Sequence, residues 1–480
     1  MKMSNRALAG ALLSLGALGL ACTAQAAGFK PCLDAASDAA LAGSVCAVEA
    51  VPADPSGAAG QGGDAGSVSL FVRSFPAVGK PRGRIWLIAG GPGESGANFY
   101  TLVPALRAAL PGFDLVIPDH RGTGFSTRMC PAEEAAGSAA GAALAGAEWN
   151  SCFAQLNADP ARTRRFSQTN AAHDLKHLLE RRRGKGKTYV YGVSYGTQLV
   201  LRTLALGARD IDGVILDSLV SLQDDDKADL SRRSLVADAV GRQRLADCDA
   251  DPRCSARLGE PAEQVYRRAL LRAAQEPQLL AAVPGGNLKQ FLGTILDLPS
   301  AARELPTLIK DIDAGKPDWA KAVLAGAERD MASLGSFPQS PSSIPLVMLI
   351  SASENTLRPG RSAAQVAEEE AGLLFASSLP GYLVGSPIPT YGRDALFARL
   401  PERLPPTLVL HGDRDAKTPY DAALRHIAAL RKAGPVRLYT AKRTGHYVLW
   451  ADRACAHAEV RRFVLGQPGG AGCVQAASSR

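Results

Sequence analysis

The stretch from Lys187 to Leu201 constrains the fold more than any other part of the sequence, because it joins a short strand, a glycine-flanked serine and a helix. A β-rich run leads into Gly192-Val-Ser-Tyr-Gly196, and an apolar run of helical type follows. Glycines at both ends of such a turn allow a tight, strained backbone that holds Ser194 at the end of the strand and the start of the helix. There the helix N-terminus favours a developing negative charge. The pattern predicts a nucleophile elbow, and a plain glycine-rich turn is the alternative.

Strands and helices alternate on both sides of this stretch, and glycine-rich turns follow several of the strands. Two continuous apolar runs, 84–89 and 113–118, are typical of strands that are buried on both faces of a sheet. The alternation predicts an α/β protein with a mostly parallel central sheet flanked by helices, in which ligands bind at the carboxyl ends of the strands. Further strands are expected at 44–51, 67–73, 188–191, 213–217, 406–410 and 436–440, and helices at 169–183, 199–206, 420–433 and 455–465.

The pattern changes after about residue 222, where strand signals fade and helical spacing dominates as far as about residue 395. We interpret this part as a helical cap inserted into the sheet domain, because strand patterns return after it. The expected division is a signal peptide at 1–26, the first part of the α/β core at 27–221, the cap at 222–395 and the second part of the core at 396–480. Cap helices are expected at 228–245, 261–274, 287–295, 301–314, 319–334 and 363–376.

The N-terminus has the features of a secretory signal peptide. Lys2 and Arg6 precede an apolar run, and the small-residue pattern Ala24-Gln-Ala26 follows it. The run is too short to span a membrane, and no later run reaches the roughly 18 apolar residues that a span needs. We therefore expect export to the periplasm or the medium, without stable membrane insertion. Lipid attachment at Cys22 is a weaker alternative, because Gly19 stands where a large aliphatic residue is expected.

Eight cysteines follow the predicted signal peptide, and an exported chain can keep them as disulfides. They fall into four pairs of near neighbours, and we expect a disulfide within each, with buried free thiols as the alternative. Their spacing does not match a structural metal site. The net charge of +8 is scattered along the chain rather than gathered into a patch. We therefore expect no metal, no cofactor and no nucleic-acid partner. The four expected pairs are 32/46, 130/152, 248/254 and 455/473.

A serine hydroxyl is a poor nucleophile at neutral pH and needs a histidine base, which in turn needs an orienting acid. In hydrolases built on this kind of turn, the acid and then the histidine follow the serine along the chain. Among the late histidines, His426 and His457 lie within expected helices, where a histidine on a helix face is the simpler interpretation. His446 follows a predicted strand and Gly445, in a loop that can reach the other strand ends. We predict that His446 is the base.

The orienting acid is also expected at the end of a strand. Asp415 follows the strand at 406–410, and Thr418 and Pro419 begin the next helix, so we predict that Asp415 is the acid. Asp413 in the same turn and Asp217 after an earlier strand are the alternatives.

A tetrahedral intermediate needs backbone N–H donors for its oxyanion. We expect one from Tyr195, which directly follows the serine. The other is expected from Gly91 in Gly90-Gly-Pro-Gly93, because a glycine lets the backbone approach the substrate closely at the end of a buried strand.

Five motifs occur in order along the chain: Gly90-Gly-Pro-Gly-Glu-Ser-Gly96, Asp119-His-Arg-Gly-Thr-Gly-Phe-Ser126, Gly192-Val-Ser-Tyr-Gly-Thr197, Gly412-Asp-Arg-Asp-Ala-Lys-Thr-Pro419 and Gly445-His446. Together they resemble the α/β-hydrolase fold. More narrowly, they resemble the exported tripeptidyl-aminopeptidase and proline-iminopeptidase group of serine peptidases. The resemblance covers nearly the whole mature chain, and the cysteine pairs 248/254 and 455/473 are similar to those of the exported members.

The resemblance implies an enzyme that releases residues from free peptide N-termini, with an acidic residue of the cap holding the substrate α-ammonium. Glu354 matches the family's acidic position after an apolar cap segment, and a buried ammonium needs a paired charge. A solvated residue at the start of a helix is the alternative for Glu354. We expect an exported serine aminopeptidase that acts through an acyl-enzyme on peptides. A carboxylesterase acting on small esters is the alternative, and a catalytically silent binding protein of the same fold is less favoured.

Overall fold

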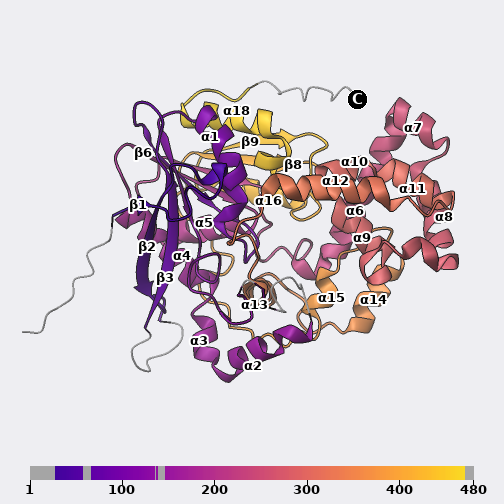
Figure 1. Cartoon of the computed structure of the whole chain (residues 1–480), viewed down its shortest axis with the longest axis horizontal. Helices are drawn as coiled ribbons and strands as arrows, with labels where there is room; N and C mark the ends of the chain where they lie inside the picture. The colour runs from indigo at the N-terminus through magenta and orange to yellow at the C-terminus, as the bar shows by residue number, and fades with distance from the viewer. Residues whose placement is uncertain (1–27, 58–65, 136, 139–145, 471–480) are drawn as a thin grey trace, which may run out of the picture.

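The computed structural model describes residues 28–470 apart from 58–65, 136 and 139–145, so the predicted signal peptide and Cys473 lie outside it. At its centre is a nine-stranded sheet with the strand order β1-β2-β3-β5-β4-β6-β7-β8-β9 (Figure 1). The pairs from β5 through β4 to β9 are parallel, and β1, β2 and β3 join them as antiparallel strands. The strands are β1 (Lys30–Pro31), β2 (Val45–Pro52), β3 (Ser67–Phe75), β4 (Gly83–Ile88), β5 (Phe113–Pro118), β6 (Lys187–Val193), β7 (Gly213–Asp217), β8 (Thr407–Gly412) and β9 (Val436–Ala441).

The central strands are buried on both faces, which explains their continuous apolar runs. In β4, Ile85 and Leu87 belong to the core on one side of the sheet, and Trp86 and Ile88 to the core on the other. Helices cover each face, so the domain has three layers. One side carries α1 (Val103–Ala109), α17 (Val448–Ala451) and α18 (Arg453–Val464), and the other α4 (Gln168–Arg181), α5 (Tyr195–Ala205) and α16 (Tyr420–Leu430).

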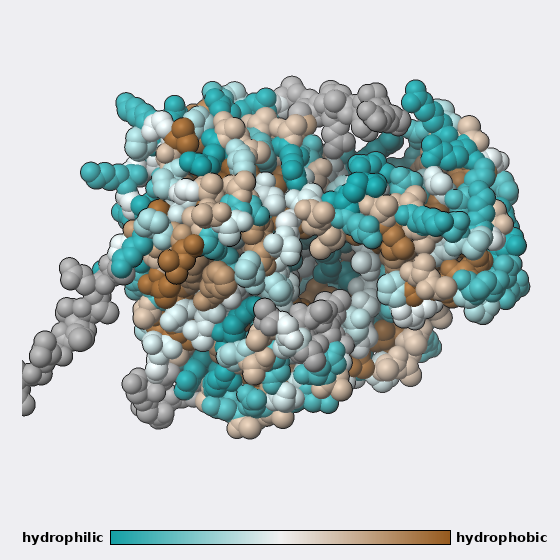
Figure 2. Space-filling model, in the orientation of Figure 1, coloured by the Kyte–Doolittle hydropathy of each residue, from teal (hydrophilic) through white to brown (hydrophobic). Residues whose placement is uncertain are grey.

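Between β7 and β8, a part of the chain that the structure describes throughout, every regular element is a helix. Most of these helices share a core of their own, which forms the right-hand part of Figure 1. Figure 2 shows the surface hollowed between this helical part and the sheet. The helices are α6 (Arg233–Ala250), α7 (Pro252–Leu258), α8 (Ala262–Gln275), α9 (Leu288–Ile295), α10 (Pro299–Arg303), α11 (Leu305–Asp313), α12 (Ala320–Leu334), α13 (Ile344–Glu354), α14 (Ala363–Ala371) and α15 (Leu379–Leu383).

The helical region departs from the sequence-based expectations in several helix boundaries and in three helices that were not predicted, α7, α13 and α15. The single helix expected at 301–314 is two helices, α10 and α11, each with a proline in its first turn, where a missing N–H does no harm. The helix expected from residue 228 starts at Arg233, after a 3₁₀ turn that Asp229 caps. Helix α13 was not predicted, and its apolar residues join the core of the sheet domain. Helices α2 (Asn150–Ala158) and α3 (Pro160–Arg164), between β5 and α4, were also missed.

Three of the four predicted disulfides are confirmed: Cys32–Cys46, Cys130–Cys152 and Cys248–Cys254. The fourth involves Cys473, outside the described residues. These disulfides are compatible with an extracellular protein. Within the described ranges, no helix has both the length and the apolar character that a membrane crossing needs.

Candidate active site

Ser194 stands between β6 and α5 in a strained backbone conformation, with φ 53° and ψ −125°. The surroundings hold it there. Its N–H donates to the carbonyl of Asp217 at 3.0 Å, and its carbonyl accepts from the N–H of Thr197 at 2.8 Å. Such strain costs on the order of 1–3 kcal/mol and persists only where neighbouring contacts fix it. The predicted elbow is therefore present, and it presents Ser194 at the carboxyl edge of the sheet.

The two flanking glycines are required by close backbone contacts. A Cβ on Gly192 would lie 2.5 Å from the carbonyl oxygen of Gly196, and a Cβ on Gly196 would lie 2.5 Å from that of Ile88. Real Cβ atoms essentially never approach backbone so closely, so neither position accepts a side chain without distortion of the turn.

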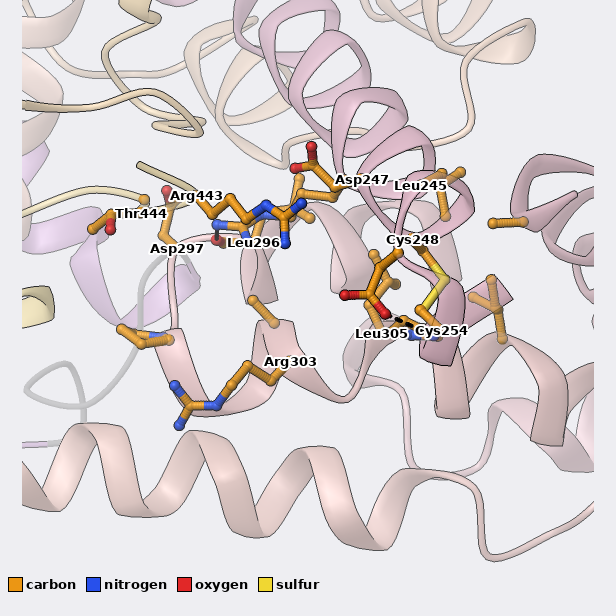
Figure 3. Close-up of a pocket in the computed structure, with 18 of the residues that line it drawn as sticks. Leu245, Asp247, Cys248, Cys254, Leu296, Asp297, Arg303, Leu305, Arg443 and Thr444 are labelled. Atoms are coloured by element: carbon orange, nitrogen blue, oxygen red, sulfur yellow. Dashed lines mark hydrogen bonds between the residues drawn. A yellow bond between two sulfur atoms is a disulfide. The ribbon is translucent and has the colours of Figure 1, made fainter. Parts of the chain in front are cut away.

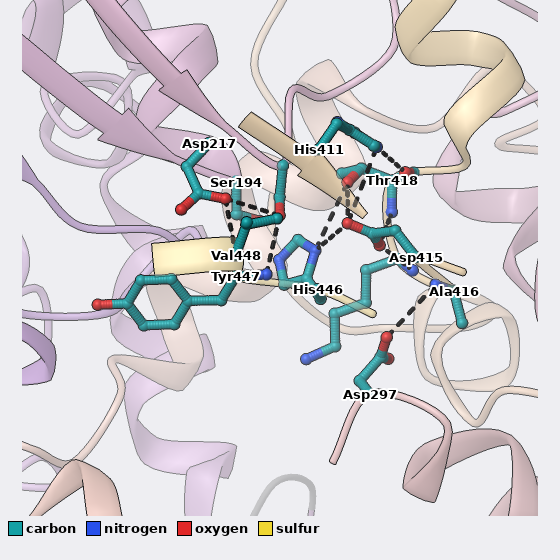
Figure 4. A network of polar contacts seen from close by, with 12 residues as sticks. Ser194, Asp217, Asp297, His411, Asp415, Ala416, Thr418, His446, Tyr447 and Val448 are labelled. Carbon is teal, nitrogen blue, oxygen red and sulfur yellow. Dashed lines mark hydrogen bonds and ion pairs between the residues drawn. The ribbon is translucent and has the colours of Figure 1, made fainter. Parts of the chain in front are cut away.

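His446 lies in the turn between β9 and α17, and its Nδ1 is 2.8 Å from Oδ2 of Asp415. When Nδ1–H is donated to this carboxylate, Nε2 carries the free lone pair. Ser194 and His446 line the same cavity, and in Figure 4 the imidazole lies between Ser194 and Asp415. The three residues predicted as nucleophile, base and acid are thus brought together from the ends of β6, β9 and β8.

The carboxylate of Asp415 is fully buried, and each of its oxygens accepts two hydrogen bonds. Oδ1 accepts from the N–H groups of Lys417 and Thr418, at 2.8 and 2.7 Å. Oδ2 accepts from the Thr418 hydroxyl at 2.8 Å and from His446. Burial alone would raise the pKa of Asp415, but His446 and these donors more than offset it and hold the pKa below its ordinary value. Asp415 therefore stays ionised and can stabilise an imidazolium.

The other histidines and acid weighed from the sequence have different partners. Asp413 accepts from the N–H of Arg443 at 2.6 Å. His426 is bonded through Nδ1 to the carbonyl of Val220 at 2.8 Å, and His457 is buried in α18. In the described part of the chain, none of the three residues is bonded to Ser194, His446 or Asp415.

Asp217, the remaining alternative acid, holds the turn that follows His446. Its carboxylate accepts from the N–H groups of Val448 and Leu449, at 2.9 and 2.7 Å. Next to it, the Ser218 hydroxyl accepts from the N–H of Tyr447 at 2.8 Å. The end of β7 therefore holds the turn that carries His446, a role that the sequence did not reveal because the partners are far apart in the chain.

The predicted oxyanion donors, Gly91 and Tyr195, both border the space beside Ser194. Gly91 has φ 108°, and a Cβ on it would lie 2.6 Å from the backbone nitrogen of Gly93. Gly90 approaches Ser194 itself, since a Cβ there would lie 3.1 Å from Cβ of Ser194. Tyr195 is the first residue of α5, so its N–H has no acceptor within the helix. Gly91 and Tyr195 thus both line the smaller cavity together with Ser194.

Two cavities meet at Ser194. The larger, of about 400 Å³, includes His446 and has apolar walls formed by Leu298, Met331, Leu334 and Trp450. The smaller, of about 60 Å³, has polar walls that include Gln198, Gln223 and Asn355. Four residues line both cavities: Gly91, Ser194, Arg233 and Lys417.

Charged side chains of both signs border the larger cavity. Glu94 comes from the loop after β4. Asp297 follows α9, and burial raises its pKa while Lys417 opposes the shift. Arg233 is the first residue of α6, and burial lowers its pKa. None of Glu94, Asp297, Arg233 and Lys417 was predicted from the sequence. For Asp297 and Arg233, no local pattern marks a residue of the helical region that faces a distant cavity.

Glu354 does not line either cavity at Ser194, which contradicts its predicted role as ligand of a substrate ammonium. It is the last residue of α13, its side chain is 2% exposed, and it forms a bidentate ion pair with Arg202 at 2.9 Å. Tyr391 and Gln223 donate to the same carboxylate, at 3.0 and 3.1 Å. Each oxygen thus accepts two hydrogen bonds, and none remains for a substrate. The alternative interpretation, a solvated residue at the start of a helix, is also wrong. Glu354 is the last residue of the apolar helix α13, and its side chain is buried.

A further cavity of about 460 Å³ lies beside the turn at Thr444 (Figure 3). Its walls include the Cys248–Cys254 disulfide, Asp297 and the side chain of Arg303. It is larger than the cavities at Ser194, but neither Ser194 nor His446 lines it. The reactive side chains, rather than the volume, therefore locate the candidate active site.

Two family models match the chain. A model of the alpha/beta hydrolase fold matches residues 83–244, which contain Gly91 and Ser194. A model of TAP-like proteins matches residues 384–468, which contain Asp415 and His446. The chain is an α/β hydrolase that resembles the tripeptidyl aminopeptidase family. The fold and the resemblance predicted from the five motifs are confirmed, and the α/β-hydrolase fold indicates hydrolase activity.

Several solved structures match most of this α/β hydrolase. An esterase from Thermogutta terrifontis with bound malate is 15% identical, with 84% of this chain and 94% of that chain covered and a TM-score of 0.37. A bromoperoxidase from Bacillus anthracis is 15% identical, with 88% and 100% covered and a TM-score of 0.36. An esterase from Exiguobacterium antarcticum is 12% identical, with 83% and 96% covered and a TM-score of 0.35. No curated protein matches the chain.

Proposed function

We propose that this α/β hydrolase is an exported serine peptidase of the aminopeptidase type, which releases residues from free peptide N-termini. The observation that carries the proposal is the His446–Asp415 pair beside the strained Ser194, in a cavity that also presents two carboxylates. The pair supplies the base that a serine nucleophile needs, and the carboxylates suit a substrate ammonium.

The proposed reaction begins when Ser194 Oγ attacks the scissile carbonyl and its proton passes to Nε2 of His446. Asp415 stabilises the imidazolium that forms. The N–H groups of Gly91 and Tyr195 donate to the oxyanion of the tetrahedral intermediate. His446 then returns the proton to the leaving amine, and the C–N bond breaks to leave an acyl-enzyme. A water molecule, deprotonated by His446, hydrolyses the ester and restores Ser194.

The substrate ammonium would be held by Glu94 and Asp297 rather than by Glu354. Both carboxylates border the cavity that contains Ser194 and His446. Asp297 is buried, and its Oδ1 accepts from the N–H of Ala416 at 3.3 Å. A cation next to a buried carboxylate favours its ionised form, so an ammonium and Asp297 would stabilise each other.

Labelling with a fluorophosphonate probe tests the nucleophile. The wild-type protein should be labelled and Ser194→Ala should not, whereas an unlabelled wild type would show a silent member of the fold. Peptide amides with a free N-terminus, the same peptides with an acetylated N-terminus, and short acyl esters then test the substrate class. An aminopeptidase should cleave the free peptides at least tenfold faster than the acetylated ones. Equal rates would exclude this specificity.

Esterase activity is the second candidate, and the apolar wall of Leu298, Met331, Leu334 and Trp450 favours it. Such a wall would bind an acyl chain without any ionic contact. Hydrolysis of esters with increasing chain length, compared with the peptide series, separates the two candidates.

A further inference from the structure

Arg233 and Lys417 have no task in the proposed reaction, although both line the two cavities that meet at Ser194. Among the described residues, the guanidinium of Arg233 and the ammonium of Lys417 make no hydrogen bond or ion pair. Two other arginines, one directly before α6 and one in its middle, do have such partners. Arg232 lies 3.7 Å from a carboxylate oxygen of Asp229, and Arg242 lies 2.7 Å from one of Asp238.

The position of Arg233 is unfavourable in the absence of a ligand. It is the first residue of an 18-residue helix, where the helix dipole disfavours a cation. Its side chain is also partly buried, and burial destabilises the charged form of the guanidinium. The acids that influence it, Asp297 and Asp415, form no ion pair with it within the described part of the chain. Asp415 already has four hydrogen-bond donors of its own.

We propose that Arg233 and Lys417 bind a carboxylate group of the substrate next to the scissile bond. The inference rests on the proposed function of Ser194, because both cations are placed at the junction where the bond to be cleaved would lie. A guanidinium forms two parallel hydrogen bonds with a carboxylate, and a lysine ammonium adds a third donor of the same charge. The carboxylate is either the free C-terminus of a short peptide or the side chain of an acidic residue.

If the carboxylate is the free C-terminus, the active cavity carries opposite charges for the two ends of a short, zwitterionic peptide. Glu94 and Asp297 face the ammonium, and Arg233 and Lys417 face the carboxylate. This arrangement favours short peptides whose two termini are both charged. A peptide that lacks either terminal charge would leave the carboxylates or the cations of the cavity without a partner.

The test uses the Ser194→Ala protein and isothermal titration calorimetry, so that binding is measured without turnover. The ligands are trialanine and its C-terminal amide, which test the terminal carboxylate. Ala-Asp-Ala amide and Ala-Asn-Ala amide test an acidic side chain. At least one acid is expected to bind about ten- to hundredfold more tightly than its neutral counterpart. Equal affinities in both pairs, or no measurable binding of either acid, would overturn the proposal.

Variants test whether Arg233 and Lys417 cause the tighter binding of the acid than of its neutral counterpart. Arg233→Gln and Lys417→Met, each in the Ser194→Ala background, should reduce the preference for the acid about tenfold. Lys417 is exposed, so its variant should fold normally. Arg242→Gln is the matched control, because Arg242 lies on the same helix, pairs with Asp238 and lines neither cavity. A preference that survives both cation variants would refute the assignment. The binding result does not depend on the labelling of Ser194, so failure of either proposal can be recognised separately.

Discussion

Replacing Glu354 by glutamine should destabilise the fold rather than weaken substrate binding. Every group bonded to its carboxylate is a donor: two guanidinium nitrogens of Arg202, the Tyr391 hydroxyl and the Gln223 amide. A glutamine keeps one acceptor oxygen but turns an NH2 group towards donors, and it leaves a buried guanidinium without its counter-charge. Breaking a buried ion pair by removing one partner costs about 3–5 kcal/mol. A typical domain has only about 5–15 kcal/mol of stability in total.

Equilibrium unfolding in guanidinium chloride, followed by circular dichroism, measures this loss. The double variant Arg202→Met/Glu354→Met removes both charges and should recover most of it, since apolar replacements of a buried pair are often neutral. Glu402→Gln is the control, because Glu402 pairs with Arg399 at the surface with a side chain 84% exposed, and its loss should change little. The reasoning is refuted if Glu354→Gln unfolds like the wild type and instead raises KM selectively for peptides with a free amine.

Three further changes test other parts of the structure. Asp415→Asn should lower kcat about 10⁴-fold, because an amide no longer holds the Nδ1–H tautomer of the base, whereas Asp413→Asn should retain activity; steady-state kinetics on one substrate distinguishes them. Gly196→Ala places a Cβ 2.5 Å from a backbone oxygen and should cost at least about 1–3 kcal/mol in unfolding free energy, while Gly360→Ala, with no atom within 4 Å, should change it little. Burial lowers the pKa of His426 to about 4, below its ordinary value near 6.5. Its contribution to stability is therefore present above about pH 6.5 and is lost, by up to about 1.4 kcal/mol per pH unit, as the pH falls towards 4. Unfolding at a series of pH values should show a shallower slope for His426→Gln, and an unchanged slope would contradict this account.

The sheet and the Ser194–His446–Asp415 constellation follow from the sequence because both depend on local patterns. A strand buried on both faces is a continuous apolar run, so the bounds predicted for β5 and β7 are the observed ones. Parallel strands bring their carboxyl ends to one edge, so residues in the turns after β6, β8 and β9 could be expected to meet.

The cap could not be predicted to the same depth, because the roles of its residues depend on how helices pack. The acidic residue after an apolar segment looked like a substrate ligand, but Glu354 meets Arg202 of α5 inside the protein. Arg233 lay in an unremarkable helical pattern, yet it borders both cavities. These outcomes are set by contacts between segments more than 100 residues apart, which periodicity does not encode.

The pairing of β7 with β8 makes this part of the sheet independent of the helices that lie between the two strands in the chain. Leu216 pairs with Val409 in the ladder, although all of the cap helices lie between them in the chain. The insertion therefore leaves and re-enters at adjacent strands, and the sheet closes without it. The entropic cost of closing a loop grows only logarithmically with its length. The helices that share a separate core, α6 to α12, can therefore be gained, lost or exchanged with little change in the stability of the sheet, whereas α13 packs into the core of the sheet domain. New substrate preferences can arise in this way while the register that holds Ser194 stays the same.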